Sequence, residues 1–332
     1  MSWERTQRSM LAGIVGPGVG EIYYLVAARG QTDHYYWLLK KRGVRDSKIF
    51  TSLSAGYDQM QDEQNDCLLV YPGNHVQTAS LTWDKDSTFI VGAGSINQRF
   101  QPTTLTEGGV RLTCTTAAVA EILSITGDYV SMYGIGTHNT AADTGNKADI
   151  KISGKNFFAD YCAFRGGTNA TQVQNATAGI PVWVASTSNG AGNALWIRNS
   201  MIGSAGNTTR TKGPGCLYFE GGGGGFNPVI ENCLLSTRCE VQTGNQSCMV
   251  LLEAAYAIDR ELLFKGTNFY CFVENLANRL DVAITDECTT THTITITPGC
   301  SFSGIDAVAT PMTYVQNAAS VGHATGGFGL NS

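Results

Sequence analysis

Five short segments in the second half of the sequence share one form, and this repeat constrains the fold more than any other feature. In each segment an apolar strand ends, a polar residue or glycine makes a corner, and a second apolar strand begins. The segments start at Ile152, Ile197, Ile230, Phe264 and Ile296, at separations of 45, 33, 34 and 32 residues. One such unit cannot bury its own apolar face, so several must stack to make a common core. The repeat therefore predicts a solenoid.

The residue types decide whether the solenoid is built from strands or helices. Helical repeats with a period of about 34 residues need alanine-rich helical periodicity. This chain instead has runs such as Thr293–Thr297, in which Thr and Ile alternate, and β-branched residues favour strands. Glycine occupies 39 positions and only 15% of the residues are charged, which favours turns and stacked backbone over solvated helices. We therefore expect an all-β solenoid.

Residues 66–94 narrow the prediction to one type of solenoid. An apolar run ends in Pro72-Gly73, a second strand ends at Trp83, and a third segment closes with Ile90-Val91-Gly92-Ala93-Gly94. This order resembles the opening of pectate-lyase-like proteins. The resemblance implies a single-stranded, right-handed parallel β-helix with a short N-terminal cap or anchor segment. We place the cap at residues 1–60, the β-helix at 61–305 and a C-terminal tail or cap at 306–332.

The N-terminal segment combines aromatic and basic residues. Residues 22–28 read as a strand, residues 35–41 as an amphipathic turn or short helix with a basic end, and residues 50–60 as a short polar helix. Aromatic side chains with a positive rim are typical of protein interfaces. We therefore predict an interface formed by Tyr23, Tyr24, Tyr35, Tyr36, Trp37, Lys40, Lys41 and Arg42. The alternative, that these residues cover the open end of the solenoid, stays open.

No cofactor or metal site is predicted. The G-x-G spacing within Gly13–Gly20 neither follows a strand before a helix nor contains Gly-Lys-Ser/Thr, so it does not indicate a nucleotide site. Ten cysteines are spread along the chain without a C-x-x-C pair, which favours free buried thiols over disulfides or zinc ligation. The five histidines are isolated from one another.

Catalytic motifs are also not recognised, so we predict no catalytic residues and no enzyme. Galacturonan hydrolases of the resembled fold carry Asp-Asp and Gly-His-Gly, which are missing here, and Arg210-Thr211-Lys212 matches their Arg-x-Lys motif in letters only. A glycosidase needs two carboxyl groups across a sugar. Three pairs are candidates, of which the second could face one groove: Asp84 with Asp86, Glu220 with Glu231, and Glu253 with Asp259.

Charge and hydropathy exclude two classes of partner. The formal charge is -5 and the 22 basic residues are scattered, so we expect no nucleic-acid binding. The apolar runs fall far short of the roughly 20 residues that span a bilayer, so we expect a soluble protein without membrane contact. The N-terminus also lacks the pattern of a secretion signal.

A β-helix with these properties resembles virion proteins of tailed bacteriophages, which include tailspikes, head fibres and capsid decoration proteins. The resemblance implies assembly in the host cytoplasm, a place in the virion, a homotrimer, and contact with the major capsid protein or another virion protein. Our first hypothesis is a capsid decoration, cement or head-fibre protein that stabilises the shell. The alternative is a short tailspike that binds or depolymerises a host surface polysaccharide.

Overall fold

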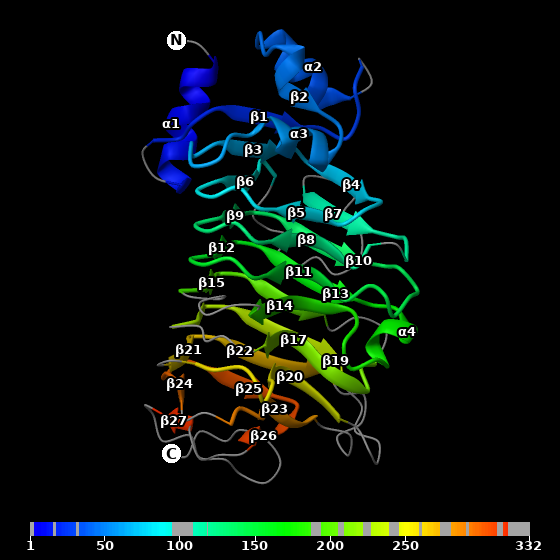
Figure 1. Cartoon of the computed structure of the whole chain (residues 1–332), viewed down its shortest axis with the longest axis vertical. Helices are drawn as coiled ribbons and strands as arrows, with labels where there is room; N and C mark the ends of the chain where they lie inside the picture. Colours follow the sequence, from blue (N-terminus) through cyan, green and yellow to red (C-terminus); the bar gives the residue numbers. More distant parts are fainter. Residues whose placement is uncertain are drawn as a thin grey trace.

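The strands form three parallel sheets that run along an elongated molecule (Figure 1). The computed structural model describes residues 3–15, 18–30, 33–94, 109–117, 119–186, 194–204, 209–221, 227–238, 246–258, 261–272, 280–289, 292–310 and 315–317. Within these ranges the chain passes from sheet A to sheet B to sheet C and then returns to sheet A one layer further along. Each turn is a coil of three strands.

The bounds of the elements follow the three sheets. Sheet A contains, in spatial order, β2 (Ile49–Phe50), β1 (Ile22–Leu25), β3 (Cys67–Val70), β6 (Phe89–Gly92), β9 (Ser131–Tyr133), β12 (Phe158–Asp160), β15 (Trp196–Arg198), β18 (Val229–Glu231), β21 (Glu261–Lys265), β24 (Thr293–Ile296) and β27 (Val315–Asn317). Sheet B contains β25 (Ser301–Ser303), β22 (Asn268–Phe272), β19 (Leu234–Arg238), β16 (Met201–Ser204), β13 (Ala163–Gly167), β10 (Gly136–Asn139), β7 (Val110–Cys114) and β4 (Gly73–Gln77). Sheet C contains β26 (Ile305–Thr310), β23 (Leu280–Asp286), β20 (Gln246–Leu252), β17 (Lys212–Gly221), β14 (Ile180–Ser186), β11 (Ala148–Ile152), β8 (Glu121–Ile125) and β5 (Leu81–Trp83). The helices are α1 (Trp3–Val15), α2 (His34–Lys41), the 3-10 helix η1 (Asp46–Lys48), α3 (Leu53–Gln59) and α4 (Ala170–Val173).

Sheet A shows how the sequence repeat becomes a core. Alternate side chains of a strand point to opposite faces, so each short strand sends one central apolar residue inward. Backbone pairing aligns these residues in one ladder: Leu68, Ile90, Met132, Ala159, Ile197, Ile230, Phe264 and Ile296. All eight are buried in the same apolar cluster. The predicted all-β parallel solenoid is confirmed.

The corner between sheets A and B explains the polar and glycine positions of the repeat. In six coils the corner residue has a left-handed backbone, which glycine and asparagine adopt more readily than other residues. These residues are Gly134, Tyr161, Asn199, Asn232, Gly266 and Gly299. The first predicted unit was out of phase, because Ile152 ends β11 in sheet C, whereas Ala159 is the residue that pairs with Ile197. With Ala159 in place of Ile152 the separation falls from 45 to 38 residues, so this error accounts for part of the irregular spacing.

The same corner stacks small polar residues and thiols. The Cys162 N–H donates to Ser200 Oγ at 3.0 Å, and the Thr267 N–H donates to Cys300 Sγ at 3.4 Å. The nine cysteines within the described ranges are free, and most are buried, which confirms the prediction of free thiols there. Cys239 lies outside the described residues.

Strands join the sheets outside both boundaries predicted for the β-helix, residues 61–305. At one end, β1 pairs with β3 and so adds the predicted cap segment to sheet A. At the other end, β26 pairs with β23 and β27 pairs with β24, so the strands continue past residue 305. The boundary was set where the last recognisable corner unit ends, but backbone pairing does not require that side-chain pattern.

The N-terminal segment forms a separate small core over the first end of sheet A. Its apolar cluster includes Leu11 of α1, Ile22 and Tyr24 of β1, and Leu39 of α2. Asp33 caps α2 by accepting from the Tyr36 N–H, and Ser52 caps α3 by accepting from the Ala55 N–H. The predicted strand and two helices are confirmed. None of the helices in the described ranges is long and apolar enough to cross a membrane.

Candidate functional site

The structure separates the predicted interface residues into buried and exposed groups. Tyr24 is fully buried, and its hydroxyl donates to Gln7 Oε1 at 2.6 Å, so its side chain belongs to the core of the cap. Tyr23, Tyr35 and Tyr36 are half-buried, whereas the remaining predicted residues are exposed on α2 and its C-terminal end: Trp37, Lys40, Lys41 and Arg42. Alternation along β1 could have indicated that Tyr23 and Tyr24 face opposite sides.

Exposed apolar side chains also lie on helices α1 and α2 of the cap. Trp37 is 44% exposed, with Lys41 Nζ 4.7 Å from the centre of its ring. On α1, Met10 is 65% exposed and Ile14 is 48% exposed. Helices α1 and α2 lie at the N-terminal end of the elongated molecule, opposite β26 and β27 (Figure 1). This end therefore presents apolar surface together with positive charge.

The structure does not bring Glu220 and Glu231 together as a glycosidase site. Glu220 lies in β17 of sheet C, but Glu231 lies in β18 of sheet A. Glu231 accepts hydrogen bonds from Lys265 Nζ at 2.7 Å and Trp196 Nε1 at 3.1 Å. The bond from Lys265 is the largest cause that lowers the pKa of Glu231. Glu231 is thus part of an ion-paired ladder.

Asp84 and Asp86 do not form a site either. Asp84 shares a short hydrogen bond with the Tyr57 hydroxyl, and Asp86 accepts from the Asp128 N–H at 2.7 Å. Both aspartates therefore hold turns, as is common for this residue type. Asp259, the predicted partner of Glu253, lies outside the described residues.

A different carboxylate pair lies on the outer face of sheet C. The Glu253 N–H donates to the Phe219 carbonyl at 2.9 Å, which places Glu253 beside Glu220 in the next coil. Burial raises the pKa of Glu220, and the charge of Glu253 raises it further. The two glutamates are one coil length apart in the sequence, so the period of the repeat could have identified this pair.

Aromatic residues and a groove border this pair. The rings of Trp183 and Tyr218 have their centres 5.5 Å apart, and Lys151 Nζ lies 4.9 Å from the centre of the Trp183 ring. Leu251 packs against this cluster and also lines a groove of about 440 Å³ that extends across β17, β20 and β23. The groove is also lined by Asp281 and Glu287, and an open groove with apolar and carboxylate side chains suits the apolar faces and hydroxyls of a sugar.

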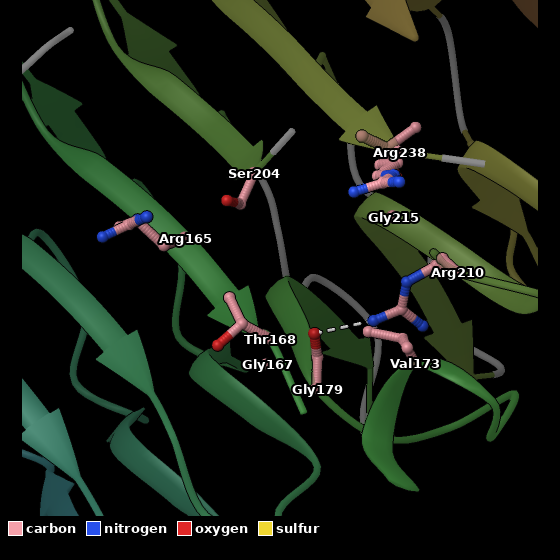
Figure 2. A pocket seen from close by; sticks show the side chains of 10 residues that line it. Arg165, Gly167, Thr168, Val173, Gly179, Ser204, Arg210, Gly215 and Arg238 are labelled. Carbon is pink, nitrogen blue, oxygen red and sulfur yellow. Dashed lines mark hydrogen bonds between the residues drawn. The ribbon is translucent and has the colours of Figure 1, made fainter. Parts of the chain in front are cut away.

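The Arg-x-Lys letters have a structural explanation. Arg210 is buried, and its guanidinium donates to the carbonyls of Gly179 at 2.9 Å and Lys212 at 3.1 Å. It also lines a small pocket with two further arginines (Figure 2). The guanidinium of Arg210 therefore holds the backbone of neighbouring coils together. It is not placed for the hydrolase role that the Arg-x-Lys motif suggested.

One group of described residues has side chains of the types that bind zinc. The ligand atoms of Asp286, Cys288 and His292 all lie within 4.8 Å of one another. His292 Nε2 is 2.9 Å from Asp286 Oδ2, and burial strongly raises the pKa of the Cys288 thiol. The thiol is therefore protonated at neutral pH. Asp286 and His292 are already paired with each other. The prediction that the protein holds no metal stays a prediction.

Comparison with known proteins defines the fold. No family model matches the sequence, and no curated protein is similar to it. A pectin methylesterase in complex with a hexasaccharide has a TM-score of 0.52 and 11% identity, over 86% of this chain and 80% of that chain. Pectin methylesterase from Erwinia chrysanthemi has a TM-score of 0.52 and 9% identity, with the same coverage. The fold is the right-handed parallel β-helix. Open reading frame 18 of Geobacillus virus E2 is also similar, at 9% identity over 82% of this chain and 58% of that chain, but its TM-score of 0.36 supports no further inference.

Proposed function

We propose that the protein is a structural protein of a tailed-bacteriophage virion, a capsid decoration or head-fibre protein that docks through its N-terminal cap. The observation that carries this proposal is the exposed apolar and basic surface at one end of the solenoid. Trp37 with Lys41 on α2, and Met10 with Ile14 on α1, present large side chains to water. Large exposed aromatic and apolar side chains are typical of protein interfaces.

The chemistry of the cap indicates the kind of partner. Lys40 is paired with Asp46 at 3.1 Å, and Lys41 Nζ lies 4.7 Å from the centre of the exposed Trp37 ring. A partner with an acidic rim around an apolar pocket would complement this surface. We assign that role to the major capsid protein or another virion protein. The proposal includes the homotrimer implied by the resemblance to virion solenoids.

The proposal is tested by rebinding the purified protein to virions that lack it. Replacing Trp37→Ala and Lys41→Glu together should reduce occupancy on the particle at least about tenfold, because the aromatic anchor and its charge are both removed. Tyr270→Ala, which removes an exposed aromatic residue from the opposite half of the molecule, should bind like the wild type. Equal binding by the cap variant, or absence of the protein from purified virions, would refute the proposal. Sedimentation of the purified chain tests the trimer separately.

A second candidate function is favoured by the groove on sheet C. In this candidate the protein binds or cleaves a polysaccharide, as a short tailspike does. The carboxyl of Glu220, whose pKa is raised, would act as general acid, and Glu253 as the second carboxylate. Leu251, which packs on the buried Trp183 and Tyr218 and lines the groove, would contact the apolar face of the sugar.

Release of reducing ends from host surface polysaccharide tests the second candidate. Wild-type protein should release them, and Glu220→Gln should abolish release while leaving binding intact, because the amide cannot donate an acidic proton. Leu251→Ala should weaken binding itself, because Leu251 lines the groove. If the wild type neither binds nor cleaves the polysaccharide, this candidate is excluded.

A further inference from the structure

The outer face of sheet A carries two rows of side chains that run along the solenoid. The buried ladder residue in each of β12, β15, β18 and β21 points inward, so its neighbours on both sides point outward. Backbone pairing aligns these neighbours in register across four coils. The apolar row consists of Phe158, Trp196, Val229 and Leu263. The charged row consists of Asp160, Arg198, Glu231 and Lys265.

The charged row alternates in sign from one coil to the next, and its members are paired within the chain. Arg198 Nη2 lies 2.9 Å from Asp160 Oδ2, and Lys265 Nζ lies 2.7 Å from Glu231 Oε1. The side chain of Asp160 is buried, whereas those of Arg198 and Lys265 are 37% and 56% exposed. Two carboxylates and two cations cancel, so the row presents alternating charge to solvent without a net charge.

The apolar row leaves an aromatic side chain exposed beside these charges. Trp196 is 37% exposed, and its ring centre lies 5.3 Å from that of Phe158. Its Nε1–H donates to Glu231 Oε2 at 3.1 Å, and the guanidinium carbon of Arg198 lies 5.1 Å from its ring centre. These contacts hold the indole in one orientation. A fixed, exposed aromatic side chain with aliphatic and charged neighbours is typical of a protein interface.

A two-fold axis parallel to the strands, between β15 and β18, makes this face complementary to itself. Such an axis reverses the order of the coils in a second copy, so that β15 faces β18 and β12 faces β21. Each row then lies over its own counterpart in reverse order. Arg198 meets Glu231 of the second copy, and Lys265 meets Asp160 of the second copy. In the apolar row, Trp196 meets Val229 of the second copy.

Other face-to-face arrangements of two copies lose this match. An axis parallel to the solenoid places the apolar row of one copy over the charged row of the other, which removes charges from water without a partner. Shifting the antiparallel copy by one coil brings Arg198 over its own counterpart and Asp160 over Glu231, and like charges in contact are unfavourable. The alternation of sign therefore selects both the orientation and the register.

We propose that the outer face of sheet A binds a second copy of this chain in the opposite orientation. The contact is separate from the docking of the cap, so this inference goes beyond the proposed function. The pair has one cap at each end. The chain in solution should therefore contain an even number of subunits, two for the pair alone or six where the proposed trimer also forms.

Sedimentation equilibrium of the full chain over a concentration series tests the pairing. Arg198→Glu and Glu231→Arg should each weaken pairing at least about tenfold, because each opposes like charges at two symmetry-related places. An equimolar mixture of these two variants should pair like the wild type, since a chain with two central carboxylates then faces a chain with two central cations. Trp196→Ala should also weaken pairing at least about tenfold.

The matched control is Lys212→Glu, which reverses an exposed charge on β17 of sheet C and should leave pairing unchanged. Three results would overturn the proposal: a monomer or an odd number of chains in the wild type, wild-type pairing by the folded single variants, or no pairing in the mixture. A trimer without pairs would contradict this inference alone, because rebinding to virions tests the cap independently. Circular dichroism establishes that the variants fold. If a charge variant does not fold, the wild-type mass and Trp196→Ala decide the outcome.

Discussion

The interior of sheet A and the small pocket lined by Arg165, Arg210 and Arg238 share coils but are built by opposite rules. In the interior ladder one class of residue recurs in every coil, from Leu68 to Ile296. In the pocket each coil contributes a different position, with Arg165 in β13, Arg210 before β17 and Arg238 at the end of β19. Repetition gives a solenoid its stability, because each coil buries the apolar row of its neighbour. Residues that break the repeat and lie close together therefore mark positions whose identity stability alone does not explain.

The largest expected effect comes from the repeating region. Phe264→Ala should destabilise the protein by about 3–5 kcal/mol, because it leaves a cavity in a core with little freedom to collapse. Phe264 is fully buried, and its ring centre lies 5.1 Å from that of Phe269. Urea unfolding followed by circular dichroism measures this change.

The neighbouring residue provides the matched control. Lys265 points outward from the same strand and pairs with Glu231 at 2.7 Å, with 56% of its side chain exposed. Lys265→Ala should cost at most about 1 kcal/mol, as expected for a surface ion pair. Equal losses in the two variants would show that the inward and outward faces of β21 have been assigned incorrectly.

The repeating region was also the part that the sequence could predict. Ile197, Ile230 and Phe264 revealed the coil, because identical environments select similar residues at a constant spacing. Asn199 and Asn232 revealed the corner, since few residue types tolerate its backbone. The phase of the first unit was wrong because Ile152 also ends a strand before a polar turn, and pattern alone does not distinguish one corner of a coil from another.

The candidate sites were harder to predict for a physical reason. Arg165, Arg210 and Arg238 have no common spacing, and they meet only because loops of different length bring successive coils to the same edge. Glu220 and Glu253 are separated by one coil, so the period of the repeat indicates their proximity, whereas the sequence prediction joined each of them to a different residue. The interface prediction failed to separate Tyr24 from its neighbours because aromatic residues serve both cores and surfaces.

A second prediction concerns the border between the two regions, where Asp149 is buried beside the arginines. Burial raises the pKa of Asp149 from 3.8 to about 6, against the opposing hydrogen bonds from Thr137 and Gly166 and the charge of Arg165. Between about pH 4 and 6 the folded chain keeps a proton that the unfolded chain releases. The free energy of unfolding should therefore fall as pH rises through this window, by about 3 kcal/mol.

Asp149→Asn tests this contribution, since the amide oxygen can accept the same hydrogen bonds without a charge. The difference in unfolding free energy between wild type and variant should be small at pH 4 and favour the variant by about 3 kcal/mol above pH 6.5. His138→Gln should have the opposite effect on the pH profile. Because the pKa of His138 is lowered to about 3, the free energy of unfolding of the wild type falls as pH drops below about 6.5, and the variant lacks this loss. A constant difference between wild type and Asp149→Asn over this range contradicts the prediction.

The smallest expected effect comes from Tyr161, which departs from repetition in isolation and faces neither candidate site. Its φ of 53° occupies the corner at which other coils have glycine or asparagine, including Asn199 in the next coil. A left-handed backbone costs an ordinary residue about 1–2 kcal/mol, and asparagine recovers part of that cost through local hydrogen bonds. Tyr161→Asn should therefore stabilise the protein by about 0.5–1 kcal/mol in urea unfolding. Asn232→Tyr, the reverse exchange at an equivalent corner, should destabilise it by a similar amount. If both exchanges destabilise the protein, the tyrosine ring contributes more through its surface contacts than the corner geometry costs, and an isolated departure from the repeat would then also mark a position selected for its contacts.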